Sequence, residues 1–146
     1  MRPYPFTSAA MSLLVALPVG TLAADTNPLV AERWKSRPVV VVVPRGDDPL
    51  LSKVNAALEK TAAREAFRER DMTLYTVVAG SGSRDGEALP AGQTRALLDA
   101  LRLDPRGPAT FLLVGKDGGV KLTDGRDVDL QAVFAEIDRM PMRQPR

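Results

Sequence analysis

The sequence predicts an α/β fold with one four-stranded mixed sheet and helices on both faces. Five consecutive valines at 39–43 are typical of a strand that is buried on both faces. Segments with helical spacing of apolar residues follow the first two expected strands. Near the end of the chain, "TFLLVGKDGGVKL" has the pattern of a β-hairpin. Strands joined through a helix are expected to be parallel, and the hairpin adds an antiparallel pair.

The first expected elements follow from helix-start signals. Asn27 and Pro28 are an N-cap and a first-turn proline, and they predict a short helix in which Val30 and Trp34 lie one turn apart. The valine run should then form a central strand. Asp48 and the proline after it repeat the start signal for a helix that runs to about residue 60, with one apolar face made of Leu50, Val54 and Leu58. Residues 62–70 either extend this helix or form a second one.

The second half of the chain alternates in the same way. Residues 72–78 predict the second strand, and "AGSGSRDGE" after it predicts a loop. A helix is expected over residues 91–103. The hairpin should use residues 110–114 and 120–122, with a turn through Asp117 and Gly118. Asp129 caps a last helix with one buried stripe, formed by Leu130, Val133, Phe134 and Ile137.

Residues 1–23 predict a secretory signal peptide. Arg2 is followed by an apolar run at 9–19 and by small residues before Asp25, with cleavage expected after Ala23 or Ala24. An uncleaved anchor is disfavoured because the apolar run is shorter than the roughly 20 residues that span a bilayer and is interrupted by Pro18. We therefore expect residues 24–146 to form one periplasmic or secreted domain that has no membrane contact after cleavage.

The composition excludes several chemistries. The sequence has no cysteine and no histidine, so thiol–disulfide exchange, thiolate peroxidase chemistry and Ser-His-Asp or Cys-His catalysis are impossible. Zinc sites made of these residues are excluded for the same reason. The 20 basic and 18 acidic residues are scattered along the chain, with no basic block long enough to follow a phosphate backbone. We expect no nucleic-acid partner and no cofactor.

The order of elements resembles the thioredoxin fold. The loop "PRGDDPLL" after the first strand lies where thioredoxins carry their Cys-x-x-C pair, and "RGPATFLL" is similar to the segment that holds a cis-proline beside it. From "NPLVAERW" through "IDRMPMR" the chain also resembles exported bacterial proteins of domain-of-unknown-function family 4174. This family has relatives in animal extracellular matrix and sushi-repeat proteins and no settled activity. The resemblance implies a thioredoxin-like domain without redox cysteines, and it supplies no functional residues.

The candidate binding surface is the end of the sheet formed by Arg45, Gly46, Asp47, Asp48 and Pro108. Ligands of open α/β sheets bind beyond the carboxyl ends of the strands, where helix N-termini offer free N–H groups. An aspartate cap satisfies these groups itself and repels anions, which favours capping over catalysis. Anything that binds there should be cationic or a protein surface.

Three other patterns have ordinary structural interpretations. "DGRDVD" at 124–129 lacks the glycine and bidentate glutamate of an EF-hand, so a turn and a cap are favoured over a calcium loop. "GSGS" at 80–83 lacks the Gly-Lys-Ser/Thr of a phosphate loop. Three aromatic residues are expected in the core: Trp34, Tyr75 and Phe111.

The function that these observations favour is an exported, non-catalytic thioredoxin-like module that binds an unidentified protein. We expect no catalytic residue and no metal site. An enzyme would need a positioned nucleophile or base, and without cysteine and histidine only carboxylates, hydroxyls, lysines and tyrosines are left for this role. Two alternatives stay open. One is a carboxylate- or metal-dependent enzyme that uses Asp47 and Asp48, and the other is a degenerate former redox protein.

Overall fold

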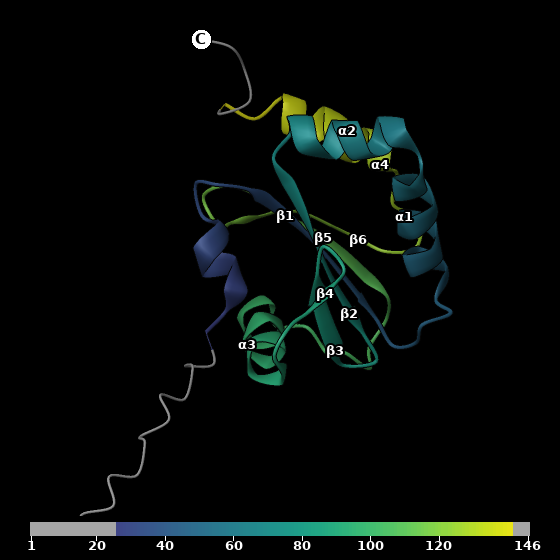
Figure 1. Cartoon of the computed structure of the whole chain (residues 1–146), viewed down its shortest axis with the longest axis vertical. Coiled ribbons are helices and arrows are strands. Elements are labelled where there is room, and N and C mark those ends of the chain that lie inside the picture. The colour runs from purple at the N-terminus through teal and green to yellow at the C-terminus, as the bar shows by residue number, and fades with distance from the viewer. Residues whose placement is uncertain (1–25, 142–146) are drawn as a thin grey trace, which may run out of the picture.

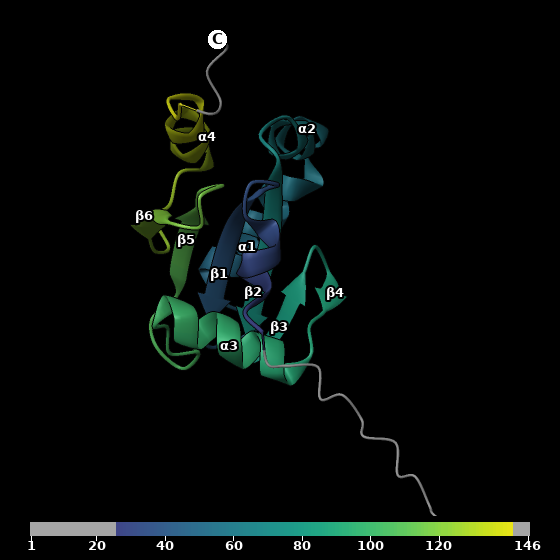
Figure 2. The same cartoon turned by 90° about the vertical axis from the view of Figure 1, so that its left-hand side faces the viewer.

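A six-stranded mixed sheet forms the centre of the protein in a computed structural model, which describes residues 26–141. The strand order is β4-β3-β2-β1-β5-β6, and Figure 2 shows this order from β6 at the left to β4 at the right. The strands are β1 (Arg37–Val43), β2 (Met72–Val78), β3 (Ser81–Arg84), β4 (Glu87–Ala88), β5 (Thr110–Val114) and β6 (Val120–Asp124). The α/β class is confirmed, whereas the expectation of four strands was wrong by two.

The valine strand β1 is an interior strand, as expected. All seven of its residues are buried, because both faces of the sheet are covered where β1 lies. It pairs in parallel with β2, where Val40 is opposite Tyr75, and antiparallel with β5, where Val42 is opposite Thr110. Alternate valines therefore enter two separate hydrophobic clusters, one on each face.

The two strands that the sequence did not predict lie in the glycine- and serine-rich segment 79–88. Two-residue turns with positive φ at Ala79 and Gly80, and again at Asp85 and Gly86, fold this segment back on β2. Gly82 of β3 leaves room for helix α3, since a Cβ atom there would lie 2.3 Å from the Thr94 hydroxyl oxygen. Strand β3 therefore requires a glycine at position 82, because the helix packs directly against it.

Helices cover both faces, as expected. Figure 1 shows α1 (Pro49–Glu59), α2 (Thr61–Glu69) and α4 (Leu130–Asp138) grouped together, with α3 (Ala91–Leu101) apart from them. The first group encloses one hydrophobic cluster, and the predicted stripe of α4 is fully buried in it. The 3-10 helix η1 (Pro28–Glu32) joins α3 over the second cluster.

The segment after α1 is a separate helix. Lys60 has an extended backbone (φ −78°, ψ 129°) and divides α1 from α2. The Arg64 guanidinium donates hydrogen bonds to the carbonyls of Leu58 (3.0 Å) and Glu59 (2.7 Å), which are left without helical partners at the end of α1. These contacts stabilise the break between the two helices.

The short N-terminal helix has the predicted start and a different end. The Asn27 side chain accepts a hydrogen bond from the Leu29 N–H at 3.0 Å, as a cap does. The helix is of 3-10 type and ends at Glu32, so Val30 and Trp34 do not form an apolar face and are both exposed. None of the helices in the described part of the chain is long and apolar enough to cross a membrane. The expected signal peptide, residues 1–23, lies outside the described residues.

Candidate functional site

The loop that the sequence singled out holds a helix cap. Asp48 is 2% exposed, and one of its carboxylate oxygens accepts the Leu50 N–H at 2.9 Å. The other oxygen lies 3.1 Å from the Arg126 guanidinium. Burial opposes ionisation of Asp48, but these two contacts outweigh it and hold the pKa of the carboxyl below its ordinary value. The predicted capping role of Asp48 is confirmed, and both of its oxygens are occupied.

The rest of the predicted surface shares one end of the sheet without converging on a point. Gly46 and Asp47 are exposed, and Asp47 pairs with the Arg45 side chain at 3.2 Å in an exposed ion pair. Pro108 is exposed just before β5, near the end of β1, and no peptide bond within residues 26–141 is cis. The same residue range contains no group of three side chains among His, Cys, Asp and Glu that could hold a metal ion.

The acidic segment 124–129 is a turn and a cap, as the sequence predicted. Asp124 accepts a hydrogen bond from the Gly125 N–H at 2.7 Å, and Asp129 accepts one from the Gln131 N–H at 2.9 Å at the start of α4. Lys53 of α1 donates to two carbonyls of this segment, those of Arg126 (2.9 Å) and Val128 (3.0 Å). The carbonyls that could have coordinated a calcium ion therefore accept hydrogen bonds from Lys53.

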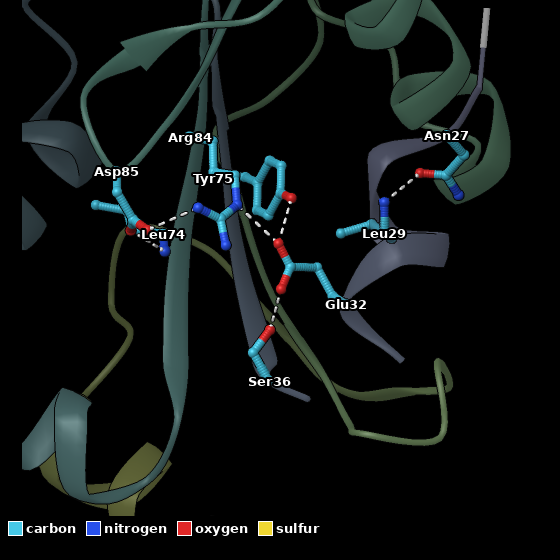
Figure 3. A network of polar contacts seen from close by, with 8 residues as sticks. All are labelled: Asn27, Leu29, Glu32, Ser36, Leu74, Tyr75, Arg84 and Asp85. Carbon is cyan, nitrogen blue, oxygen red and sulfur yellow. Dashed lines mark hydrogen bonds and ion pairs between the residues drawn. The ribbon is translucent and has the colours of Figure 1, made fainter. Parts of the chain in front are cut away.

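A buried polar network, which the sequence did not predict, lies under η1 (Figure 3). The Glu32 carboxylate is 6% exposed and accepts hydrogen bonds from the Tyr75 hydroxyl at 2.8 Å and from the Arg84 guanidinium at 2.7 Å. The Ser36 hydroxyl donates to its second oxygen. The network therefore ties η1 and the start of β1 to strands β2 and β3.

The network has a fixed charge distribution. Burial alone would raise the pKa of Glu32, but the three donors outweigh burial and lower it. Burial and the neighbouring carboxylate raise the pKa of Tyr75, and the hydrogen bond to Glu32 raises that of Arg84. Glu32 is therefore an anion, Arg84 a cation and Tyr75 neutral at pH 7, which suits a structural anchor better than an acid–base pair.

Trp34, which was expected in the core, is 67% exposed. This correction has a local cause: η1 ends at Glu32, and Trp34 lies in the turn that follows, with φ of 65°, instead of one helical turn after Val30. The other two aromatic predictions are confirmed, since Tyr75 is 1% and Phe111 0% exposed. Among the described residues only Val30 and Val120 are comparable exposed large apolar side chains.

The backbone of Trp34 has a conformation that is costly for an aromatic residue. Its φ of 65° lies in the left-handed region, which only glycine and a few small polar residues adopt at little cost. Two contacts hold it there: the Trp34 N–H donates to the Lys116 carbonyl at 2.7 Å, and the Ser36 N–H donates to the Glu32 carbonyl at 3.0 Å. Such strain persists where the surrounding structure fixes it, and it is concentrated at functional sites.

A groove of about 500 Å³ lies beside Trp34. We call it the Trp34 groove; its walls are Trp34, residues 115–117 and Lys121 of the β5–β6 hairpin, and Glu136, Arg139, Met140 and Pro141 at the end of α4. The volume lies within the range of ligand-binding pockets. The hairpin cations are paired, Lys116 with Asp71 and Lys121 with Asp117, each at 2.7–2.8 Å.

Fold and site together define a small cysteine-free α/β domain with an exposed tryptophan held at the edge of a groove. The chain belongs to the family described as domain of unknown function (DUF4174), whose model matches residues 28–146. The predicted family is thereby confirmed. No curated protein matched the chain, and no solved structure did.

One sequence signal could have identified Trp34 as exposed. It stands between two cations in "ERWKS", and a tryptophan that enters a core seldom has a charged residue on both sides. The groove itself could not have been predicted, because its walls come from three segments that are far apart in the sequence.

Proposed function

We propose that this protein is an exported, non-catalytic, thioredoxin-like module that binds another protein through the Trp34 groove. The observation that carries the proposal is Trp34: a large aromatic side chain that is 67% exposed on a backbone with φ of 65°. The indole is not buried, so no hydrophobic stabilisation offsets the cost of the left-handed backbone at Trp34. Interaction with a partner is the simplest reason for the fold to keep both features.

A thioredoxin-like architecture is supported by the inner four strands. They lie in the order β2-β1-β5-β6, with β1 parallel to β2 and antiparallel to β5, and β5 antiparallel to β6. The sequence predicts these four strands, the parallel pair β1 and β2 and the antiparallel hairpin of β5 and β6, whereas the antiparallel pairing of β5 with β1 was not predicted. The pair β3 and β4 extends the sheet beyond β2 and leaves this arrangement intact.

A binding role is supported by the chemistry of the chain. Thiol and imidazole groups are missing from the whole sequence, and the described buried carboxylates, Glu32 and Asp48, are each held by hydrogen bonds in an ionised form. Tryptophan is among the residues that contribute most to protein interfaces, and methionine adapts its shape to different partners. Trp34 and Met140 line the same groove.

The test uses the fact that Trp34 is the only tryptophan of the chain. The purified protein is used to select binders from a phage library of random dodecapeptides without tryptophan, and binding of the synthetic peptides is measured by the emission of Trp34. Trp34→Ala should abolish binding measured by calorimetry. The matched control is Val30→Ala, which shortens another exposed apolar side chain and should leave the affinity within about twofold. Equal binding to wild type and Trp34→Ala would contradict the proposal.

A further inference from the structure

We propose that the partner segment is acidic: it places an apolar side chain in the Trp34 groove and carboxylates beside Arg33 and Lys35. This inference rests on the proposed function and adds the chemistry of the partner. The two cations are exposed and flank Trp34 in the sequence. They leave the backbone on either side of Trp34, so two positive charges lie close to the groove.

Charge pairing distinguishes these two residues from the cations of the groove walls. Lys116, Lys121 and Arg139 are each paired with a carboxylate, so the walls carry little net charge. Among the cations of residues 26–141 that are not fully buried, those that form ion pairs are Arg45, Arg70, Arg84, Lys116, Lys121, Arg126 and Arg139. Arg33 and Lys35 are not in this set, and their charges are left for a partner.

The position of Arg33 links this charge to the groove. A Cβ atom on Gly118 would lie 2.8 Å from the Arg33 Nε atom, so the arginine side chain lies against the turn of the β5–β6 hairpin. The same turn supplies the groove wall at residues 115–117. A chain that enters the groove past this turn therefore passes the guanidinium, where bidentate contact with a carboxylate is favourable.

The shape of the site favours a peptide over an anionic membrane. Membrane-surface segments present apolar side chains on a convex face that can enter the acyl boundary. Trp34 instead forms one wall of a concave site, together with Met140. A concave site of about 500 Å³ accommodates one or two side chains of a partner.

The test begins with the composition of the selected dodecapeptides. We expect the binders that require Trp34 to be enriched in Asp and Glu around one large apolar residue, relative to the unselected library. The synthetic peptide with the highest affinity is then compared with its amide analogue, in which Asn and Gln replace Asp and Glu. The amide analogue should bind at least about fivefold more weakly, because it lacks the charges that Arg33 and Lys35 attract.

Charge reversal on the protein gives the matched comparison. Arg33→Glu/Lys35→Glu should weaken binding of the acidic peptide by about tenfold or more and reduce its dependence on salt. The control Lys60→Glu/Arg95→Glu changes net charge by the same amount at two other exposed cations without ion pairs among the described residues, and should change the affinity by less than about twofold. Circular dichroism of each variant verifies folding.

The possible failures separate the two proposals. Binders that need Trp34 but are neutral or basic, or that are indifferent to Arg33→Glu/Lys35→Glu, would overturn the acidic partner and leave the proposed function intact. Selection that yields no binder dependent on Trp34 would overturn both. The last probe is vesicles of phosphatidylglycerol and phosphatidylethanolamine. If Trp34 emission shifted to the blue with vesicles and not with the acidic peptide, the partner would be a membrane surface and the proposal of an acidic peptide would be overturned.

Discussion

The backbone N–H of Trp34 donates to the backbone carbonyl of Lys116 at 2.7 Å. This hydrogen bond joins the turn after η1 to the β5–β6 hairpin, two segments that are 82 residues apart in the sequence. On the other side of the turn, Glu32 is bound to Tyr75 and Arg84. The turn is thus fixed from both sides, and the backbone of Trp34 has a defined position.

Backbone strain at Trp34 predicts an unusual stability order. Trp34→Gly should be more stable than Trp34→Ala by about 1 kcal/mol, because glycine adopts φ near 65° without the steric cost that an alanine Cβ retains. Both substitutions remove the same exposed indole, so their difference reports the backbone alone. Denaturant midpoints of the two variants measure it, and identical midpoints would show that the turn is not strained.

The buried carboxylate predicts a pH-dependent stability. Glu32→Gln should lower the free energy of unfolding by about 1–3 kcal/mol at pH 7, since hydrogen bonds to a charged group are lost. The pKa of Glu32 is lowered in the fold from an ordinary 4.5, so its contribution is complete above about pH 4.5 and is lost as pH falls through the folded value.

Urea titrations of wild type and Glu32→Gln between pH 7 and pH 2.5 follow this difference. The gap between the two proteins should be constant near neutrality and should narrow in acid. Other carboxylates with lowered pKa values, Asp48 and Asp117, are present in both proteins and cancel in the comparison. A gap that widens as the pH falls would contradict the ionised state of Glu32.

The cap of α1 predicts different effects for two substitutions of one residue. Asp48→Ala should cost about 0.5–2 kcal/mol, because the Leu50 N–H loses its acceptor in a buried position. Asp48→Asn keeps an acceptor and loses only the charge pairing with the largely exposed Arg126, so it should cost less than about 1 kcal/mol.

Denaturant midpoints with and without calcium or magnesium test this cap. Asp47→Ala is the control, since Asp47 is exposed and its pairing with Arg45 contributes little. If Asp48→Ala left the midpoint unchanged and a divalent ion raised that of the wild type, Asp48 would be a metal ligand and not a cap.

Close packing of α3 on β3 predicts that Gly82 is intolerant of any side chain. Gly82→Ala should destabilise the protein by about 1–3 kcal/mol, because its Cβ would lie 2.3 Å from the Thr94 hydroxyl oxygen. Gly46→Ala is the control, with its nearest neighbour an ordinary 3.8 Å away at Val78. Thermal melts should also show that Thr94→Ala recovers part of the loss at Gly82. Equal tolerance of alanine at both glycines would contradict the close contact.

The sequence predicted the elements whose signals are local. The valine strand, the caps at Asp48 and Asp129 and the stripe of α4 depend on residues within one or two turns, and all are confirmed. The strands β3 and β4 were missed because Gly82 is required by the helix above it, and strand propensity does not report such contacts. Two-residue turns at 79–80 and 85–86 were the available signal.

The candidate site was harder to predict for a similar reason. At the end of β1 the cap at Asp48 was predicted correctly, but the side chains around Arg45 and Pro108 do not converge on one site. The Trp34 groove and the Glu32 network depend on contacts between residues 32–34 and segments around 75, 84 and 116. Only the fold brings these together.

The most direct test of the account is a map of the bound peptide on the protein. Amide chemical shifts of the isotope-labelled full chain are compared with and without the selected acidic peptide. We expect the largest changes at residues 33–36, 115–121 and 136–141, which surround Trp34. A contradictory result would be changes at residues 45–48 and at Ala109, the amide that follows Pro108, with none around Trp34. The peptide would then bind at the end of the sheet, where the sequence predicts the binding surface.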